Sequence, residues 1–225
     1  FHSVEKRYAP SWSVLPILGS KCVYSEGIAL KHYLMSTSYK NDKKFTVREM
    51  IMAILEENRS LVKRLNDKAA QDFIRSILDA GCIFFSAQGR AGFILRCFCM
   101  RLMHLGFTVY FCGETITPAI TRNDLLIVLS GSGETPSTLE SVKSAKKYHA
   151  KTYGILGNME SRIASIVDTS IHLPGTTKLC LKGEPHSLQM AGSLFEQSAF
   201  FFLEAIVLKI YQKRKQNVGS VSSRH

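Results

Sequence analysis

The stretch Leu125-Leu126-Ile127-Val128-Leu129-Ser130-Gly131-Ser132-Gly133-Glu134-Thr135 decides the fold of this chain. Its five leading apolar residues predict a buried strand. A helix is expected from about Pro136 to Tyr148, since proline is favourable at a first helical position. Between the two lies a turn rich in Gly and Ser. In α/β folds such a turn binds phosphate, because glycine lets the backbone approach the anion and the helix N-terminus offers unpaired N–H groups.

The hydroxyl groups of this turn favour a small phosphorylated ligand. Ser130, Ser132 and Thr135 add three possible donors. The turn has no lysine, so it is not a P-loop, and its spacing is not G-x-G-x-x-G. A phosphorylated small molecule therefore fits better than a nucleotide. An ordinary polar turn between strand and helix remains the alternative.

A second turn of the same type lies earlier in the chain. The apolar residues Cys82-Ile83-Phe84-Phe85 run into Ser86-Ala87-Gln88-Gly89-Arg90-Ala91-Gly92, and a helix is expected from about Phe93 to Leu105. Two such units suggest adjacent parallel strands, whose turns open on the same edge of the sheet, where ligands bind. Arg90 would offer a cationic fork to phosphate, and a solvated surface arginine is the alternative.

Composition indicates a globular protein without a nucleic-acid or membrane role. The chain has 225 residues, 45% of them hydrophobic, and a net charge of +11. The basic residues are spread along the chain, and neither zinc-finger spacing nor an RNA-recognition motif is present. The positive charge can instead attract an anionic substrate. No apolar run is long enough to cross a bilayer.

The six cysteines do not form a Cys-x-x-Cys pair. They are expected to be buried free thiols in a reducing cytoplasm, with neither a disulfide framework nor a metal site. The chain begins Phe1-His2-Ser3 without an initiating Met, which suggests a fragment or a processed product and does not look like a signal peptide.

Three regions are expected along the chain: an N-terminal extension of unknown role (1–44), one α/β domain (45–215) and a tail (216–225). Two helices are expected within 45–78, and a long helix from about Ser193 to Lys213 is apolar nearly all round, which predicts a subunit interface. Alternating elements between them predict a parallel sheet with helices on both faces: strand 82–86, helix 92–105, strand 107–112, strand 125–129, helix 136–148, strand 152–156, helix 160–166 and strand 169–173.

Four segments together resemble the 6-phospho-3-hexuloisomerases of the sugar isomerase (SIS) domain superfamily: Met100 to Gly106, Gly113 to Pro118, Ser130 to Thr135 and Gln189 to Gln197. The resemblance covers about Phe45 to Gln212. It implies a three-layer α/β sandwich with a five-stranded parallel sheet of the flavodoxin-like type. It also implies a homotetramer, without metal or organic cofactor, that interconverts D-arabino-3-hexulose 6-phosphate and fructose 6-phosphate; a cytoplasmic location is expected from the free thiols.

The chain departs from the family pattern in three places. Ala87 and Ala91 stand where the family has Gly and Ser in Gly-x-Gly-Arg-Ser-Gly, so one hydroxyl is missing. Gln189-Met190 lacks the family's Pro after Gln. The tail ends Arg224-His225. These two residues are either the start of the family's Arg-His-Ala-Asn-Leu-Glu end or a chance match after a divergent tail.

The resemblance also assigns roles to residues. Moving a ketone from C3 to C2 through a cis-enediol needs one base, and Glu196 is the candidate; a helix-dipole role for this first-turn Glu is the alternative. His225 is expected to assist if it is the tail His of the family. The residues expected to bind the substrate and its phosphate are Ser86, Gly89, Arg90, Ser130, Ser132, Thr135 and Ser193.

Two other functions remain open at the level of sequence. One is a non-catalytic SIS regulator that senses a sugar phosphate, although the region before Phe45 is short for the helix-turn-helix domain of such regulators. The other is an aldose-ketose isomerase of the arabinose-5-phosphate type.

Overall fold

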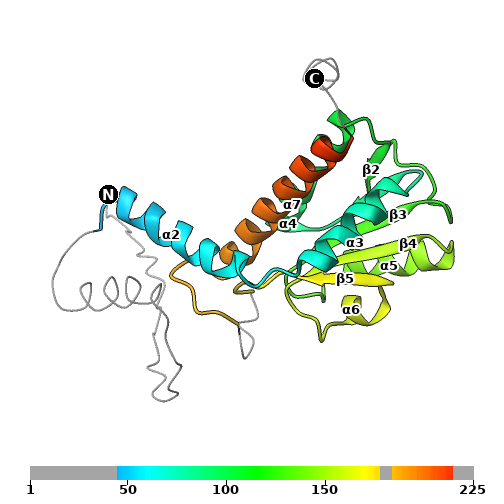
Figure 1. Ribbon diagram of the computed structural model, residues 1–225. Coiled ribbons are helices and arrows are strands. Elements are labelled where there is room, and N and C mark those ends of the chain that lie inside the picture. The colour runs from blue at the N-terminus through cyan, green and yellow to red at the C-terminus, as the bar shows by residue number, and fades with distance from the viewer. Residues whose placement is uncertain (1–44, 178–183, 215–225) are drawn as a thin grey trace, which may run out of the picture. The chain divides into compact units, whose positions relative to one another are not determined.

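The computed structural model describes residues 45–177 and 184–214, which belong to one compact unit. Its centre is a sheet of five parallel strands in the order β2-β1-β3-β4-β5 (Figure 1). The strands are β1 (Ile83–Ser86), β2 (Val109–Phe111), β3 (Leu125–Ser130), β4 (Lys151–Leu156) and β5 (Thr169–His172). This is the flavodoxin-like strand order, with its switch point between β1 and β3. The α/β fold class is therefore confirmed.

Helices cover both faces of the sheet and make three layers. One face carries α3 (Asp67–Leu78), α4 (Gly89–His104) and α7 (Ser193–Lys213), and the other carries α5 (Pro136–Lys147) and α6 (Arg162–Ile166). Successive strand residues point to opposite faces of the sheet. Phe85 packs in the hydrophobic core under α3, α4 and α7, and Phe84 packs in the core under α5 and α6. Burial on both faces explains why β3 reads as an uninterrupted apolar run.

The helix α2 (Val47–Val62) precedes this sandwich and contacts α7. Thr46 and Glu49 form the capping box at its start, each side chain bonded to the other's backbone N–H. Among the described residues, no helix is long and apolar enough to cross a membrane.

Two predicted boundaries shift for local reasons. Helix α4 begins at Gly89, earlier than expected, because the backbone enters the helix through Gly89 at φ +59°. Arg90 therefore lies in the first turn of α4. Strand β2 is shorter than the predicted strand 107–112, because the Phe107 N–H closes the end of α4 by donating to the Leu102 carbonyl at 3.1 Å.

The cysteine prediction is partly wrong. The described cysteines Cys82, Cys97, Cys99 and Cys112 are free thiols, as expected. However, Cys97 is exposed, because it lies on the side of α4 that faces away from the sheet, and the other three are half-buried. Burial raises the pKa of the Cys99 thiol to about 11, so this thiol stays protonated at neutral pH.

The start of α7 is held at the carboxyl edge of the sheet by Phe195, which is 2% exposed. Glycines that follow three neighbouring strands make room for it. A Cβ atom on Gly131 would lie 3.1 Å from Phe195 Cδ1, one on Gly157 would lie 3.1 Å from Phe195 Cδ2, and one on Gly175 would lie 2.5 Å from Phe195 Cα. These distances mean that the loops after β3, β4 and β5 all pack closely against the first turn of α7.

We predict that Gly175→Ala destabilises the protein by about 1–3 kcal/mol, the usual cost of overpacking, because the new methyl group meets helix backbone that cannot rotate away. Urea unfolding measures the change. Gly81→Ala, at the opposite edge, is the comparison and should cost less, since its Cβ atom would lie 3.3 Å from the Asn123 carbonyl oxygen instead of 2.5 Å from a helix backbone atom. Equal stability of Gly175→Ala and the wild type would contradict the packing described.

Candidate active site

The two turns predicted to bind phosphate lie side by side at the carboxyl edge of the sheet. Strands β1 and β3 pair in parallel, with Ser86 opposite Val128. The turns after them lead into α4 and α5. The topological switch point between β1 and β3 is where doubly wound sheets bind ligands. The sequence prediction that both turns share one edge is confirmed.

The helices differ in how their N-termini are capped. Helices α2, α3 and α6 start with a side-chain cap from Thr46, Asn66 and Ser161. Helices α4, α5 and α7 start without one, at Gln88, Thr135 and Gly192. A helix N-terminus without a cap keeps N–H donors and a partial positive charge available to a ligand. All three uncapped helices begin at the edge just described.

Hydrogen bonds inside the turn 130–135 fix its shape. Ser130 Oγ accepts from the Gly133 N–H at 3.0 Å and lies 3.4 Å from Thr135 Oγ1. Ser132 Oγ accepts from the Glu134 N–H at 3.2 Å. Gly133 has φ +67°, and a Cβ atom there would lie 1.9 Å from Ser161 Oγ. Only glycine fits at this position, so the turn needs the residue that the sequence has.

Glu134 clamps the turn to α6. Its carboxylate accepts from the Arg162 N–H at 2.8 Å and from Arg162 Nε at 2.5 Å, and the Ile163 N–H donates to the Gly133 carbonyl at 3.1 Å. The backbone hydrogen bond from Arg162, followed by its side-chain hydrogen bond, lowers the pKa of Glu134 below 4.5. The clamp is therefore intact at neutral pH and is lost only as the pH falls through this lowered value.

A buried carboxylate lies in the first turn of α7. Glu196 is 5% exposed, and its Oε2 atom lies 2.9 Å from Arg90 Nε in an ion pair that joins α7 to α4. Arg90 Nη1 also donates to Ser193 Oγ at 3.1 Å. The structure thus brings together three residues that the sequence analysis had singled out separately. A buried carboxylate that a neighbouring cation keeps ionised can act as a base.

A polar network ties the segment before α7 to α2. The Glu57 carboxylate accepts from the Leu188 N–H at 2.8 Å, from Ser187 Oγ at 2.7 Å and from Gln189 Nε2 at 3.0 Å. Gln189 in turn accepts from Gln197 at 2.6 Å. These contacts hold the approach to Gly192 and Glu196 in place. Sequence reasoning missed Glu57, because it lies more than a hundred residues from its partners and no local pattern marks it.

The other residues predicted for the site lie next to it or outside the described part of the chain. Ser86 is buried, and its hydroxyl donates to Ser141 Oγ of α5 at 2.9 Å. Gly89 opens α4, next to Arg90. His225 lies outside the described residues, as do Cys22 and Cys180. The described residues contain no group of three or more side chains that could hold a metal ion.

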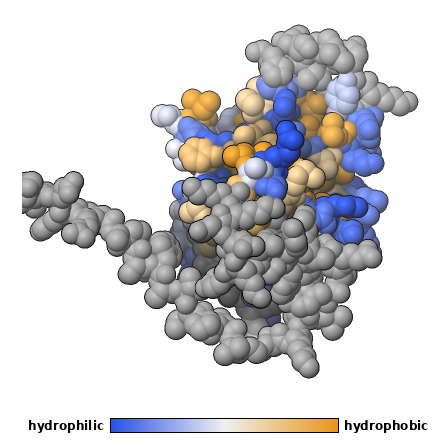
Figure 2. Space-filling model, turned by 90° about the vertical axis from the view of Figure 1, so that its left-hand side faces the viewer, coloured by the Kyte–Doolittle hydropathy of each residue, from blue (hydrophilic) through white to orange (hydrophobic). Residues whose placement is uncertain are grey.

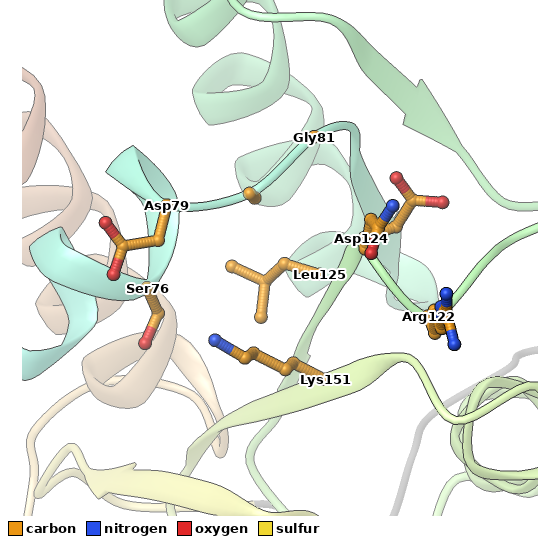
Figure 3. Close-up of a pocket in the computed structure, with 9 residues that line it drawn as sticks. Ser76, Asp79, Gly81, Arg122, Asp124, Leu125 and Lys151 are labelled. Atoms are coloured by element: carbon orange, nitrogen blue, oxygen red, sulfur yellow. The ribbon is translucent and has the colours of Figure 1, made fainter.

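Two cavities lie away from this edge. The one in Figure 3, of about 390 Å³, lies at the amino ends of β1, β3 and β4, where Lys151 extends toward Ser76 and Asp79. Its Asp124 carboxylate already accepts from the N–H groups of Cys82 and Thr121, so this acid stabilises loops. The other, of about 620 Å³, is a basic groove between α3 and α7 that includes Lys68, Arg75, Lys209 and Lys213. Neither cavity contains a residue predicted for catalysis.

These features define a doubly wound α/β protein whose uncapped helices meet beside a buried carboxylate. The chain belongs to the SIS domain family, whose model matches residues 76–197. It is 34% identical to the 3-hexulose-6-phosphate isomerase of Bacillus subtilis over 177 residues, which cover 79% of this chain and 96% of that protein. It is 38% identical to the 3-hexulose-6-phosphate isomerase of Mycobacterium gastri over 151 residues, which cover 67% and 75% of the two chains.

A solved structure supports the same relationship. A Methanococcus jannaschii protein, whose structure infers a function of 3-hexulose-6-phosphate isomerase, superposes with a TM-score of 0.68 at 34% identity. The match covers 79% of this chain and 97% of that protein. The predicted resemblance to this isomerase family is therefore confirmed.

We predict that Glu134→Ala weakens phosphate binding, because the turn 130–135 loses its clamp to α6. We expect roughly a threefold to tenfold rise in the dissociation constant for fructose 6-phosphate, equivalent to the loss of about one hydrogen bond. Calorimetric titration gives the value. Glu140→Ala is the matched control, since Glu140 pairs with Lys143 on the exposed side of α5. If Glu134→Ala binds fructose 6-phosphate as tightly as the wild type, the turn 130–135 does not bind the phosphate.

Proposed function

We propose that this chain is an isomerase that interconverts D-arabino-3-hexulose 6-phosphate and fructose 6-phosphate. The observation that carries the proposal is the buried Glu196 carboxylate, paired with Arg90 where α4, α5 and α7 begin. The names of the relatives at 34–38% identity point to the same reaction.

In the proposed reaction, Glu196 removes the proton on C2 of the 3-hexulose phosphate. The C2–H electron pair forms the C2=C3 bond of a cis-enediol, and the C3 carbonyl oxygen takes up a proton. Return of a proton to C3, with loss of the O2 proton, leaves the ketone at C2. One carboxylate placed above the enediol can serve both carbons, so the reaction needs no redox partner. His225 is proposed as an assisting group.

The substrate phosphate is proposed to bind at the uncapped start of α5. The backbone N–H groups of this first turn, with the hydroxyls of Ser130, Ser132 and Thr135, offer donors to an anion. Gly89 and Ser193, in the first turns of α4 and α7, would contact the rest of the sugar phosphate, and buried Ser86 would support α5 through Ser141. A phosphate held at a fixed site brings the sugar carbons to the same place in each turnover.

A coupled assay for fructose 6-phosphate tests this function. The 3-hexulose phosphate is the substrate, with ribulose 5-phosphate and arabinose 5-phosphate as controls. Conversion of the 3-hexulose phosphate alone is expected. Conversion of arabinose 5-phosphate would support the aldose-ketose alternative, and binding without any turnover would support the regulator. The relatives' names do not favour either alternative.

We predict that Glu196→Gln lowers turnover by ~10²–10⁴-fold, the usual contribution of a general base, because the amide keeps the shape and cannot accept the proton. Exchange of the carbon-bound proton in deuterated water should fall in parallel. Glu204→Gln, on the same helix and 35% exposed at its side chain, is the control. A well-folded Glu196→Gln protein with normal turnover would exclude the catalytic role.

We also propose that the protein is a homo-oligomer assembled through α4 and α7; the tetramer is the state that the resemblance implies. Figure 2 shows hydrophobic side chains gathered among hydrophilic ones on one face of the molecule. Large exposed apolar side chains on these two helices support the proposal: Phe93, Met100, Phe200, Phe201 and Leu208. Phe202, in contrast, is buried against the sheet and does not contribute.

Phe201→Asp is expected to lower the molecular mass in solution to that of a smaller assembly, because it places a charge on a surface that another copy covers. Light scattering at micromolar concentration measures it. Tyr148→Asp, at the end of α5 on the opposite layer, should leave the mass unchanged. A wild-type protein that is already a stable monomer would contradict the proposal.

A further inference from the structure

Arg90 makes its polar contacts with the first turn of α7. In the described part of the chain, its guanidinium forms an ion pair with Glu196 through Nε and donates a hydrogen bond to Ser193 through Nη1. The sequence analysis expected Arg90 to bind the substrate phosphate. Its contacts connect Arg90 to the carboxylate that is proposed to move the proton, which suggests a different role.

The ion pair joins two groups in very different surroundings. The Glu196 side chain is 7% exposed, whereas the Arg90 side chain is 58% exposed. Burial disfavours an ionised carboxyl group, and an adjacent cation favours it. Arg90 therefore supplies the charge that a carboxylate in this buried position needs, while its own guanidinium keeps its contact with water.

The ion pair is short and is supported from a second side. Arg90 Nε is 2.9 Å from Glu196 Oε2, so the cation lies directly against the carboxylate that is proposed to accept the proton. Ser193, one turn before Glu196 on α7, fixes the guanidinium from its other end.

We propose that Arg90 is a positioning residue for Glu196: it keeps the carboxylate ionised and oriented, and the phosphate is bound by the start of α5. This inference rests on the proposed isomerisation, because it assigns Arg90 a role in that reaction. It predicts that Arg90 acts on the protonation of the base and not on substrate affinity.

The titratable groups on the segments next to α7 have other partners. They are Glu57 on α2, which accepts from the Leu188 N–H; Glu134, which accepts from the Arg162 N–H; His172 on β5, whose Nε2 lies 3.1 Å from the Gly157 carbonyl oxygen; and Glu184, which accepts from the Thr177 N–H. Within the described residues, Arg90 is the cation that lies at ion-pair distance from Glu196. The proposal therefore concerns this pair.

Arg90→Met tests the proposal through the pH profile. At pH 7 we expect kcat to fall roughly tenfold or more, because the carboxyl group then stays protonated to a higher pH. Raising the pH should restore kcat toward the wild-type value, and KM should stay within about twofold. Arg90→Lys keeps the charge and should recover part of kcat at pH 7. If KM rises at every pH while kcat is unchanged, Arg90 binds phosphate and the proposal is wrong.

Arg101→Met is the matched control. Arg101 also lies on α4 and pairs with Glu204 of α7 at 3.8 Å, so its loss removes one charge from the same pair of helices without touching Glu196. Its pH profile should match the wild type. Arg90→Gln serves as the second variant if Arg90→Met does not fold.

Two measurements separate this inference from the proposed function, since neither needs turnover. With glutamate side-chain carboxyls labelled with ¹³C, and Glu196→Gln used for assignment, the NMR titration midpoint of Glu196 should lie at higher pH in Arg90→Met than in the wild type. Inorganic phosphate should raise the melting temperature of both proteins equally. The same midpoint in both proteins would overturn the role of Arg90, even if the protein is an isomerase.

Discussion

The close approach of α7 to the carboxyl edge of the sheet is the constraint on which the rest of the site depends. Phe195 inserts where Gly131, Gly157 and Gly175 leave no side chain in its way. Burying a Phe side chain contributes about 1.5–3 kcal/mol, and here it also fixes a helix end. Without that contact, Glu196 would not lie against Arg90, and the segment after β3 would lose the surface on which it rests.

The second feature of the site is that only some helices have a side-chain cap at the N-terminus. Helices α2, α3 and α6 satisfy their first N–H groups with their own side chains. Helices α4, α5 and α7, which start around the candidate site, have no side-chain cap for their first N–H groups. An anionic substrate would accept hydrogen bonds from these N–H groups. In the proposed division of roles, α5 binds the phosphate, α7 carries the base, and α4 supplies the cation that keeps the base ionised.

Much of this could be predicted from the sequence, and the limits have physical causes. The apolar run of β3, the Gly/Ser turn after it and the all-round apolar pattern of α7 are local signals, so the fold, the shared edge and the bounds of α7 followed from them. Contacts between distant segments left no such signal. Arg90 and Ser193 are 103 positions apart, and Leu188 is 131 positions from Glu57, so neither contact could be found from spacing. The exposure of Cys97 was missed because an apolar helix does not tell which of its sides meets the sheet.

A crystal structure of the protein with fructose 6-phosphate would show where the phosphate and the reacting carbons bind. We expect the phosphate to accept hydrogen bonds from the turn 130–135 and the first turn of α5, with C2 and C3 of the sugar next to the Glu196 carboxylate and Arg90 still paired with Glu196. A phosphate bound instead in the basic groove between α3 and α7, or in the cavity at the amino ends of the strands, with no sugar atom near Glu196, would contradict the proposed site.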